Sequence, residues 1–160
     1  MDLVISHADE TRSGGTPRGE PPDPVAFAAT AERMTNTRDL DGVIAGYSDD
    51  AVLESITDGA REVHRGRDEL RAAWSAYFAV MRQSGFRLTK QLLAADDEWI
   101  TNSWHGTMAG AAAYGLQAWR FGPDGHVISH LLYSSTCGRQ PIRWPASGCS
   151  RPTRSPLSAS

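Results

Sequence analysis

Residues 38–55 read RDLDGVIAGYSDDAVLES, and within this stretch a helical pattern gives way to a strand pattern. The apolar side chains of its first half have the i, i+3, i+4, i+7 spacing of one buried helical stripe, at Leu40, Val43, Ile44 and Tyr47. Asp39 precedes the stripe, where its carboxylate can accept hydrogen bonds from the first free backbone N–H groups. Residues 51–56 alternate like a strand with one covered face. We therefore expect a short helix that ends at Ser48-Asp49-Asp50 and leads directly into a strand.

The composition indicates one folded domain. The chain has 160 residues, of which 40% are hydrophobic, and a net charge of −3, which suits a single substantial core and gives no general attraction to nucleic acid or anionic lipid. No apolar run approaches the roughly 20 residues of a membrane span, and the N-terminus lacks a basic region followed by an apolar one. We expect a cytoplasmic protein that has neither nucleic acid nor membrane among its partners.

The two ends of the chain differ in composition from the middle. Residues 1–24 contain clustered glycine and proline, and residues 137–160 contain proline among serine and unopposed arginine, so neither end can readily offset the entropy of ordering. We predict disordered segments there and a single domain over residues 25–136. Cys137 and Cys149 lie in the second end and are expected to be free thiols. No His, Cys and carboxylate set has the spacing of a metal site.

Further elements follow from the periodicity of the middle segment. Helices are expected over residues 25–36 and from about residue 68 to Ser84-Gly85, and strands over residues 61–65, 86–94, 99–108, 112–121 and 126–134. Short turns between long alternating runs indicate an antiparallel meander that curls when helices cover one face. The expected fold class is α+β, with three helices inside a curved antiparallel sheet that is open at one end. Such a cone leaves a pocket for a small ligand.

Three segments carry a family resemblance. The first is a helix followed by Asp39-Leu40-Asp41-Gly42, an aromatic residue, Asp49-Asp50-Ala51 and a strand; the others are Gly66-Arg67-Asp68-Glu69-Leu70 with Trp74, and the final hairpin over residues 119–128. Together they resemble the nuclear transport factor 2-like superfamily and its SnoaL-like branch, whose relatives include ketosteroid isomerases, polyketide cyclases and limonene epoxide hydrolases. The resemblance covers about residues 25–135 and implies a cone-shaped α+β barrel.

Strand parity indicates which side chains would line the cone. When the final hairpin is laid on the family pattern, the inward positions are Ile128, His130, Leu132 and Ser134 on the last strand, Gly115, Gln117 and Trp119 on the one before, and Ile100, Asn102, Trp104 and Gly106 on the third. A slip of one residue in the third strand would bring His105 inward instead of Trp104. Leu131 and Tyr133 point outward, where they suit a homodimer formed through the outer sheet face.

The resemblance also shows which catalytic groups are missing. The position similar to the isomerase general base is Ser55, whose hydroxyl takes no proton near neutral pH without help. The positions similar to the two oxyanion donors are Ala31 and Gln117, and alanine donates nothing. An epoxide hydrolase of this superfamily would need an Asp-Arg-Asp set that the inward positions do not supply. Steroid isomerisation and epoxide hydrolysis of the known types are therefore not expected.

His130 remains as the candidate catalytic residue. An imidazole titrates near neutral pH and can move a proton to or from carbon or oxygen, and SnoaL-like relatives commonly carry a histidine at this point of the last strand. The alternative is a histidine hydrogen-bonded in the cavity wall. Asn102 and Gln117 could orient a ligand carbonyl or hydroxyl, or could hydrogen-bond to each other.

The remaining candidates are substrate-binding residues. Large aromatic rings could form a slot for a rigid apolar substrate, although such a stripe is often plain core; with Ser55 and Leu132 the set is Tyr47, Trp74, Tyr77, Trp104 and Trp119. We expect the Tyr47 hydroxyl near the pocket floor as a donor. Glu54 is expected to point outward and pair with an arginine, or to become the general base if its strand is bulged. His64 lies near a pocket rim in this fold, but we expect it to be exposed.

Two functions are consistent with the sequence. The first is an acid–base enzyme without metal or other cofactor, in which His130 promotes isomerisation, cyclisation or dehydration of a hydrophobic carbonyl compound. The second is a non-catalytic small-molecule-binding or dimeric assembly module, since this fold hosts many unrelated tasks.

Overall fold

The computed structural model describes residues 22–137, so most of the two predicted disordered ends, Cys149 included, lies outside the described residues. Pro24 and Cys137, which were expected in those ends, are instead the first residue of a helix and the last residue of a strand. Its elements, in chain order, are α1 (Pro24–Thr37), α2 (Leu40–Ala45), β1 (Tyr47–Thr57), β2 (Ala60–Arg65), α3 (Gly66–Gln83), β3 (Arg87–Ala95), β4 (Trp99–Met108), β5 (Ala111–Phe121) and β6 (Val127–Cys137). The expected number and order of helices and strands are confirmed. None of these helices combines the length and apolar character needed to cross a membrane.

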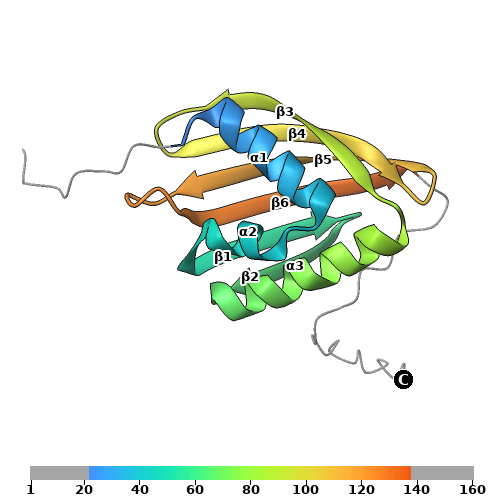
Figure 1. Cartoon of the computed structure of the whole chain (residues 1–160), viewed down its shortest axis with the longest axis horizontal. Helices are drawn as coiled ribbons and strands as arrows, with labels where there is room; N and C mark the ends of the chain where they lie inside the picture. The colour runs from blue at the N-terminus through green and yellow to red at the C-terminus, as the bar shows by residue number, and fades with distance from the viewer. Residues whose placement is uncertain (1–21, 138–160) are drawn as a thin grey trace, which may run out of the picture.

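The strands form one six-stranded sheet in the order β2-β1-β6-β5-β4-β3 (Figure 1). The sheet is mixed rather than fully antiparallel, because β1 and β6 are parallel. The connectivity explains this correction. Helix α3 returns the chain so that β3 runs in the direction of β2, and three hairpin reversals then leave β6 running with β1. The sheet is strongly curved but not closed, since β2 and β3 remain as its two edges.

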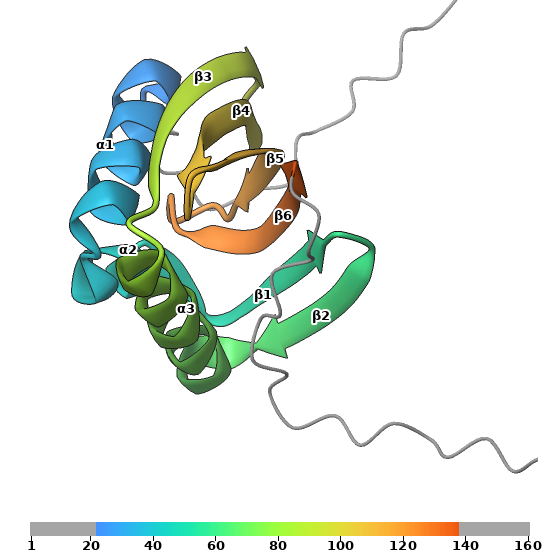
Figure 2. The same cartoon turned by 90° about the vertical axis from the view of Figure 1, so that its right-hand side faces the viewer.

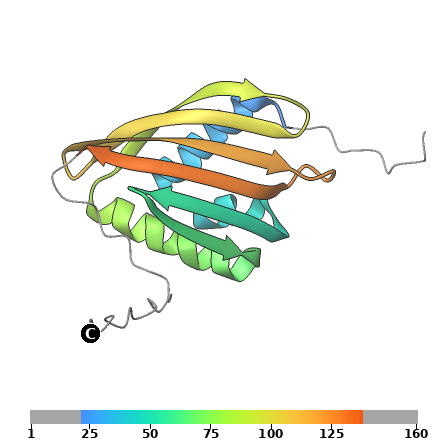
Figure 3. The same cartoon turned by 180° about the vertical axis from the view of Figure 1, so that it is seen from behind.

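All three helices lie on the concave face of the sheet. The end-on view shows the strands curling around the helix layer (Figure 2), and the view from behind shows the convex face without helical cover (Figure 3). Helix α3 contributes one apolar face to the core, formed by Leu70, Ala73, Trp74, Tyr77, Phe78 and Met81. This spacing places the large side chains of α3 toward the sheet and the charged ones toward solvent.

The junction between α2 and β1 corrects one sequence prediction. Asp39 caps α2 as expected, because its Oδ1 accepts a hydrogen bond from the Gly42 N–H at 2.9 Å. The helix ends at Ala45, however, and Tyr47 is the first residue of β1 rather than the end of the helical stripe. The Val127 N–H donates to the Gly46 carbonyl at 2.9 Å. Pairing with β6 thus draws this backbone into the sheet and overrides the helical periodicity.

The predicted inward and outward faces of the meander are observed except at the start of β6. There the pairing with β5 shifts register between Arg120 and Phe121, so Val127 is buried in place of the predicted Ile128. Inward side chains of β4, β5 and β6 are buried, among them Asn102, Gln117 and His130. His105 is exposed, so the one-residue slip considered for β4 does not occur. Leu131 and Tyr133 point to the convex face and are 41% and 44% exposed.

Candidate functional site

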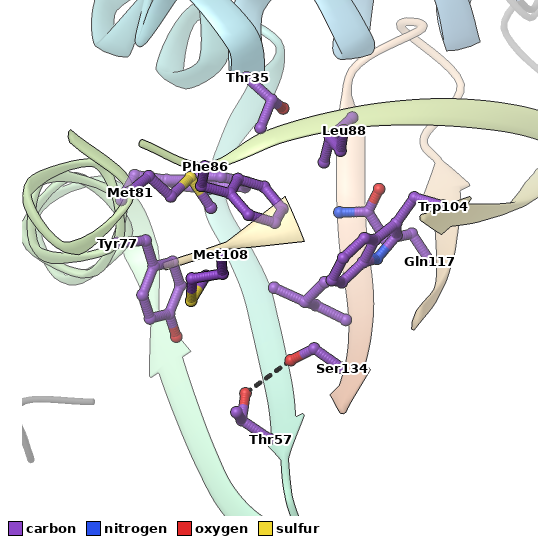
Figure 4. A pocket seen from close by; sticks show the side chains of 12 residues that line it. Thr35, Thr57, Tyr77, Met81, Phe86, Leu88, Trp104, Met108, Gln117 and Ser134 are labelled. Atoms are coloured by element: carbon purple, nitrogen blue, oxygen red, sulfur yellow. Dashed lines mark hydrogen bonds between the residues drawn. The ribbon is translucent and has the colours of Figure 1, made fainter. Parts of the chain in front are cut away.

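Two adjacent cavities lie between the helices and the concave face of the sheet. The His130 cavity, about 50 Å³, is lined by Phe27, Ala31, Met34, Thr35, Val43, Gly46, Tyr47, Trp74, Lys90, Gln117, Trp119, Val127 and His130. The Tyr77 cavity, about 30 Å³, is lined by Thr35, Thr57, Trp74, Tyr77, Met81, Phe86, Leu88, Trp104, Met108, Gln117, Leu132 and Ser134 (Figure 4). Thr35, Trp74 and Gln117 line both, so the cavities share a wall.

His130 projects from β6 into the first cavity, and its hydrogen bonds define its tautomer. The residue is 1% exposed, and its Nδ1 lies 2.6 Å from the Tyr47 hydroxyl. The Trp74 Nε1–H donates to the same hydroxyl oxygen at 3.2 Å. Because an indole can only donate, the Tyr47 oxygen accepts from Trp74 and its own hydrogen is available for Nδ1 of His130. The imidazole hydrogen is then on Nε2, which is buried and has no partner among the described residues.

The surroundings of His130 keep its ring neutral. Burial, and secondarily the charge of Lys90, hold the pKa of His130 well below its usual value. Its ring stacks on Trp119 with centroids 5.0 Å apart and on Trp74 with centroids 6.1 Å apart. Burial also raises the pKa of Tyr47, so its hydroxyl stays protonated. His130 is therefore a neutral hydrogen-bond donor. It lines the cavity, and its Nε2–H has no partner among the described residues.

Lys90 is the functional candidate that the sequence analysis missed. It lies on the concave face of β3, donates from Nζ to Gln117 Oε1, and places Nζ 5.2 Å from the centroid of the Trp119 ring. Burial lowers the pKa of Lys90 to about 7, against an opposing effect of Glu32. Two signals could have found it: Lys90 occupies the inward position between Leu88 and Leu92, and it is the only lysine in the sequence.

The Lys90 ammonium has no carboxylate within ion-pair distance in the described part of the chain. Glu32 on α1 is the acid whose charge acts on Lys90, and its Oε2 accepts from the backbone N–H of Lys90 at 2.7 Å. A partly buried ammonium without a paired carboxylate loses its proton more readily than an exposed one. Near neutral pH Lys90 is thus divided between its charged and neutral forms.

Gln117 and Asn102 do not bond to each other, although they are directly paired across β4 and β5. Gln117 lines both cavities and accepts from Lys90. Asn102 lines neither; its Nδ2 donates to the Ser103 carbonyl at 3.1 Å, and its Oδ1 is buried with no partner among the described residues. The structure thus gives Gln117 a place at the candidate site and leaves Asn102 in the strand layer behind it.

The second cavity is bordered by another group of polar side chains. The Tyr77 hydroxyl donates to Ser55 Oγ at 3.0 Å and lies 3.4 Å from His64 Nε2, which in turn lies 3.6 Å from Glu62 Oε2. His64 is 6% exposed, so the expectation of an exposed histidine is wrong. The side chain of Tyr77 packs edge-on against it and covers it. Ser55 lies behind Tyr77 and lines neither cavity.

The structure also places the remaining residues that were considered for the site. Glu54 points outward and pairs with Arg61 at 2.6 Å, as expected. Trp104 and Leu132 line the Tyr77 cavity, and the Trp104 Nε1–H is buried with no partner in the described chain. Gly115, which pairs with Trp104 across the strands, leaves room for its ring: a Cβ there would lie 2.7 Å from the indole. Residues 22–137 contain no group of three metal-ligating side chains close enough to hold an ion.

Comparisons with known proteins agree with this architecture. Residues 27–130 match the SnoaL-like domain family, while no curated protein matches the chain. Among solved structures, a steroid delta-isomerase from Pseudomonas aeruginosa is 18% identical with a TM-score of 0.55, and the match covers 74% of this chain and 80% of that one. A sequence identity of 18% is too low to transfer an activity, so this similarity establishes the fold alone.

Two further solved structures have a similar fold. SalBIII, an epoxide hydrolase/cyclase-like enzyme of pyran ring formation in polyether salinomycin, is 17% identical, with a TM-score of 0.54 and coverage of 69% of this chain and 89% of that one. A Mycobacterium tuberculosis protein in complex with estradiol-17beta-hemisuccinate is 18% identical, with a TM-score of 0.52 and coverage of 68% and 92%.

Proposed function

This chain belongs to the SnoaL-like family, and from that premise we propose that it is a cofactor-independent acid–base enzyme acting on a hydrophobic small molecule with a carbonyl group. The reaction class is isomerisation, cyclisation or dehydration. The isomerase and the cyclase-like enzyme of similar fold support this class, and the polar groups of the His130 cavity supply chemistry that suits it.

The observation that carries the proposal is the unpartnered Nε2–H of His130. A buried N–H without a partner is costly, and in a native protein it calls for an explanation. A substrate carbonyl oxygen in the His130 cavity would accept this hydrogen bond. A neutral imidazole fixed as a donor stabilises the negative charge that develops on that oxygen when a proton leaves the neighbouring carbon. The Tyr47 and Trp74 hydrogen bonds hold the imidazole in the required tautomer.

In this proposal His130 donates a hydrogen bond to the substrate and does not accept the substrate proton. Because its pKa lies well below the usual value, the imidazole is neutral at pH 7, and its Nδ1 is occupied by Tyr47. The proton acceptor is a different group of the same cavity. Lys90 provides an amine that is partly deprotonated near neutral pH, and among residues 22–137 no carboxylate lines either cavity.

The size of the cavities bears on the substrate. Volumes of about 50 and 30 Å³ are well below the roughly 300–1,000 Å³ of drug-sized ligand pockets. A compact ketone or aldehyde therefore fits the unliganded site best. A larger substrate requires the side chains shared by the two cavities, Trp74 and Gln117, to move apart.

The test is carbonyl-directed proton exchange. Hydrophobic ketones and aldehydes are first screened for thermal stabilisation of the protein, since a ligand of the folded state raises its melting temperature. Each hit is then incubated in D₂O, and exchange of the hydrogens next to the carbonyl is followed by NMR. We expect exchange that His130→Gln slows by about 10²- to 10⁴-fold, while His105→Gln, on the exposed face of β4, leaves it unchanged. Hits that bind without exchange would refute the enzymatic proposal.

A second candidate function is a binding or assembly module. The absence of a carboxylate from the cavity linings favours it, as does the apolar convex face, where Tyr114, Leu116, Leu131 and Tyr133 are all exposed. Such a surface suits a homodimer. Light scattering that shows a dimer, abolished by Tyr133→Glu, together with ligand binding that His130→Gln changes only in affinity, would establish this function in place of catalysis.

A further inference from the structure

We propose that Lys90 is a covalent catalytic residue, whose amine forms an imine with the carbonyl carbon of an aldehyde or ketone held in the His130 cavity. This inference rests on the proposed function and names its substrate class and its nucleophile. It gives Lys90 a bond-forming role, whereas the proposed function requires only that some group in the cavity accept a proton.

The first support is the use of basic residues across the chain. Lys90 is the only lysine among the 16 lysine and arginine residues of the sequence. Every other cation is a guanidinium, which stays protonated in proteins and cannot act as a nucleophile. The one side chain that can present a neutral amine thus lines a cavity instead of lying on the surface.

The second support is how Nζ is held. Gln117 Oε1 accepts a hydrogen bond from it, which fixes the amine through one hydrogen and leaves the nitrogen lone pair of the neutral form available. The charge of Glu32 favours the ammonium form, but Glu32 contacts the Lys90 backbone N–H and makes no ion pair with Nζ in the described part of the chain. Desolvation beside Trp119 favours the neutral amine, as it does for lysines that form Schiff bases.

The third support is the position of His130. Both His130 and Lys90 line the same cavity and both contact the ring of Trp119, the imidazole at 5.0 Å and Nζ at 5.2 Å from its centroid. We infer that a carbonyl group bound in this shared cavity accepts a hydrogen bond from Nε2–H at its oxygen while its carbon faces the amine. This arrangement polarises the carbonyl for attack.

The chemical step balances without a cofactor. The amine lone pair forms a C–N bond as the carbonyl π bond opens, and one amine proton moves to the oxygen to give a carbinolamine. The remaining N–H proton and the hydroxyl then leave as one water, and the C=N bond forms. Overall, one carbonyl and one primary amine give one imine and one water. The imine withdraws electrons from the neighbouring carbon, which makes its hydrogens more acidic.

Reductive trapping tests the proposal. The full chain is incubated at pH 7 with 2-butanone and sodium cyanoborohydride, which reduces an imine to a stable secondary amine, and the products are analysed by intact mass and peptide mapping. We expect one adduct, mapped to Lys90. We expect none in Lys90→Arg or Lys90→Met beyond slow labelling of the N-terminal amine, with circular dichroism used to verify that both variants fold.

A matched control keeps one lysine but moves it. The double variant Lys90→Arg with Arg71→Lys places the amine on the exposed face of α3, where position 71 pairs with Asp41. An amine with a pKa near 7 is deprotonated to a far greater extent at pH 7 than an exposed one near 10.5, so the wild type should be trapped about a hundredfold faster or more. Equal trapping in the two proteins would overturn the proposal.

The remaining outcomes separate this inference from the proposed function. If the wild type gives no adduct while Lys90-dependent hydrogen exchange of the ketone persists, imine formation is overturned and a non-covalent acid–base enzyme remains. If neither adduct nor exchange is found for any bound ketone, both proposals fail. If His130→Gln slows trapping while Lys90 still reacts, the donor role of His130 is supported together with the nucleophile.

Discussion

The two buried histidines of this protein differ in a way that separates a candidate catalytic group from a structural one. His64 and His130 are 6% and 1% exposed, and each lies beside a tyrosine hydroxyl. Around His64, the Tyr77 hydroxyl gives its hydrogen to Ser55, so the imidazole Nε2–H lies between two acceptors, the Tyr77 oxygen and Glu62. Around His130, the tyrosine donates to Nδ1 and the opposite N–H finds no acceptor among the described residues.

Burial is thus common to both histidines, and hydrogen-bond satisfaction distinguishes them. A satisfied imidazole stabilises the fold, whereas an N–H at a cavity with no acceptor in the described part of the chain is available to a ligand. The same contrast extends to the cations. Arginine side chains pair with carboxylates on the surface, such as Arg67 with Asp49 at 2.8 Å, while Lys90 has a neutral amide as its partner. At the His130 cavity, an imidazole nitrogen without a partner and an amine without a carboxylate line the same space.

The largest difference is expected in catalysis. His130→Gln should lower kcat/KM for a carbonyl substrate by about 10²- to 10⁴-fold, because the amide does not reproduce the fixed N–H donor. His64→Gln should lower it less than about tenfold, since His64 does not line either cavity. Steady-state kinetics with folded variants makes the measurement. Equal losses in the two variants would remove the distinction drawn between the histidines.

The second expected effect is on the pH dependence of stability. The pKa of Lys90 is about 7 in the folded chain and returns to its ordinary value near 10.5 on unfolding, so between these values the unfolded chain binds more protons. The free energy of unfolding should therefore rise with pH from 7 to 9, by about 1.4 kcal/mol per pH unit. Glu32 and His130 are the other titratable groups that act on this charge.

Lys90→Met isolates this contribution. The variant should flatten the slope between pH 7 and 9 and unfold at a higher temperature than wild type at pH 6, because it removes a charge that is costly to bury. Urea titrations at each pH provide the measurement. A wild-type slope that is unchanged in Lys90→Met would show that the Lys90 ammonium is hydrated in solution. A gain of stability with loss of activity is typical of a functional site.

A smaller effect on stability is expected at Tyr47 and Tyr77, and the tautomer of His130 distinguishes the two tyrosines. Tyr47→Phe and Tyr77→Phe should each lower the free energy of unfolding by roughly 1–2 kcal/mol, since each leaves a buried partner unsatisfied. Only Tyr47→Phe should alter the tautomer of His130, because Nδ1 loses its donor. Nitrogen-15 chemical shifts of the imidazole report the tautomer directly. A His130 spectrum that Tyr47→Phe leaves unchanged would contradict the hydrogen-bond assignment.

The smallest effect is expected at Glu62. Its carboxylate lies 3.6 Å from His64 and its side chain is 27% exposed, so the pair contributes little when screened by solvent. Glu62→Gln should change the free energy of unfolding by less than about 0.5 kcal/mol. Thermal melts at pH 6 and pH 8 provide the check. A loss of several kcal/mol would show that the contact between Glu62 and His64 is a major stabilising interaction.

Much of the fold could be predicted from the sequence because its signals are local. The alternation along β4, β5 and β6 identified the buried faces, and the spacing of Leu70, Trp74 and Tyr77 identified the core face of α3. The parallel pairing of β1 with β6 and the transfer of Tyr47 from helix to strand could not be predicted, because both depend on strand partners far away in the sequence.

The candidate site, like the fold, was predictable from the sequence only in part. The sequence determined that His130 and Gln117 would point inward, since side-chain direction alternates along a strand and the family resemblance of the final hairpin indicated which set faces the helices. Only the tertiary structure decided that Tyr47 would hold one nitrogen of His130, that Asn102 would turn away from Gln117, and that Lys90 would lie unneutralised in the same cavity. Hydrogen bonds and desolvation depend on groups brought together from α1, β1, β3 and β6, and such distances are set by packing and not by spacing along the chain.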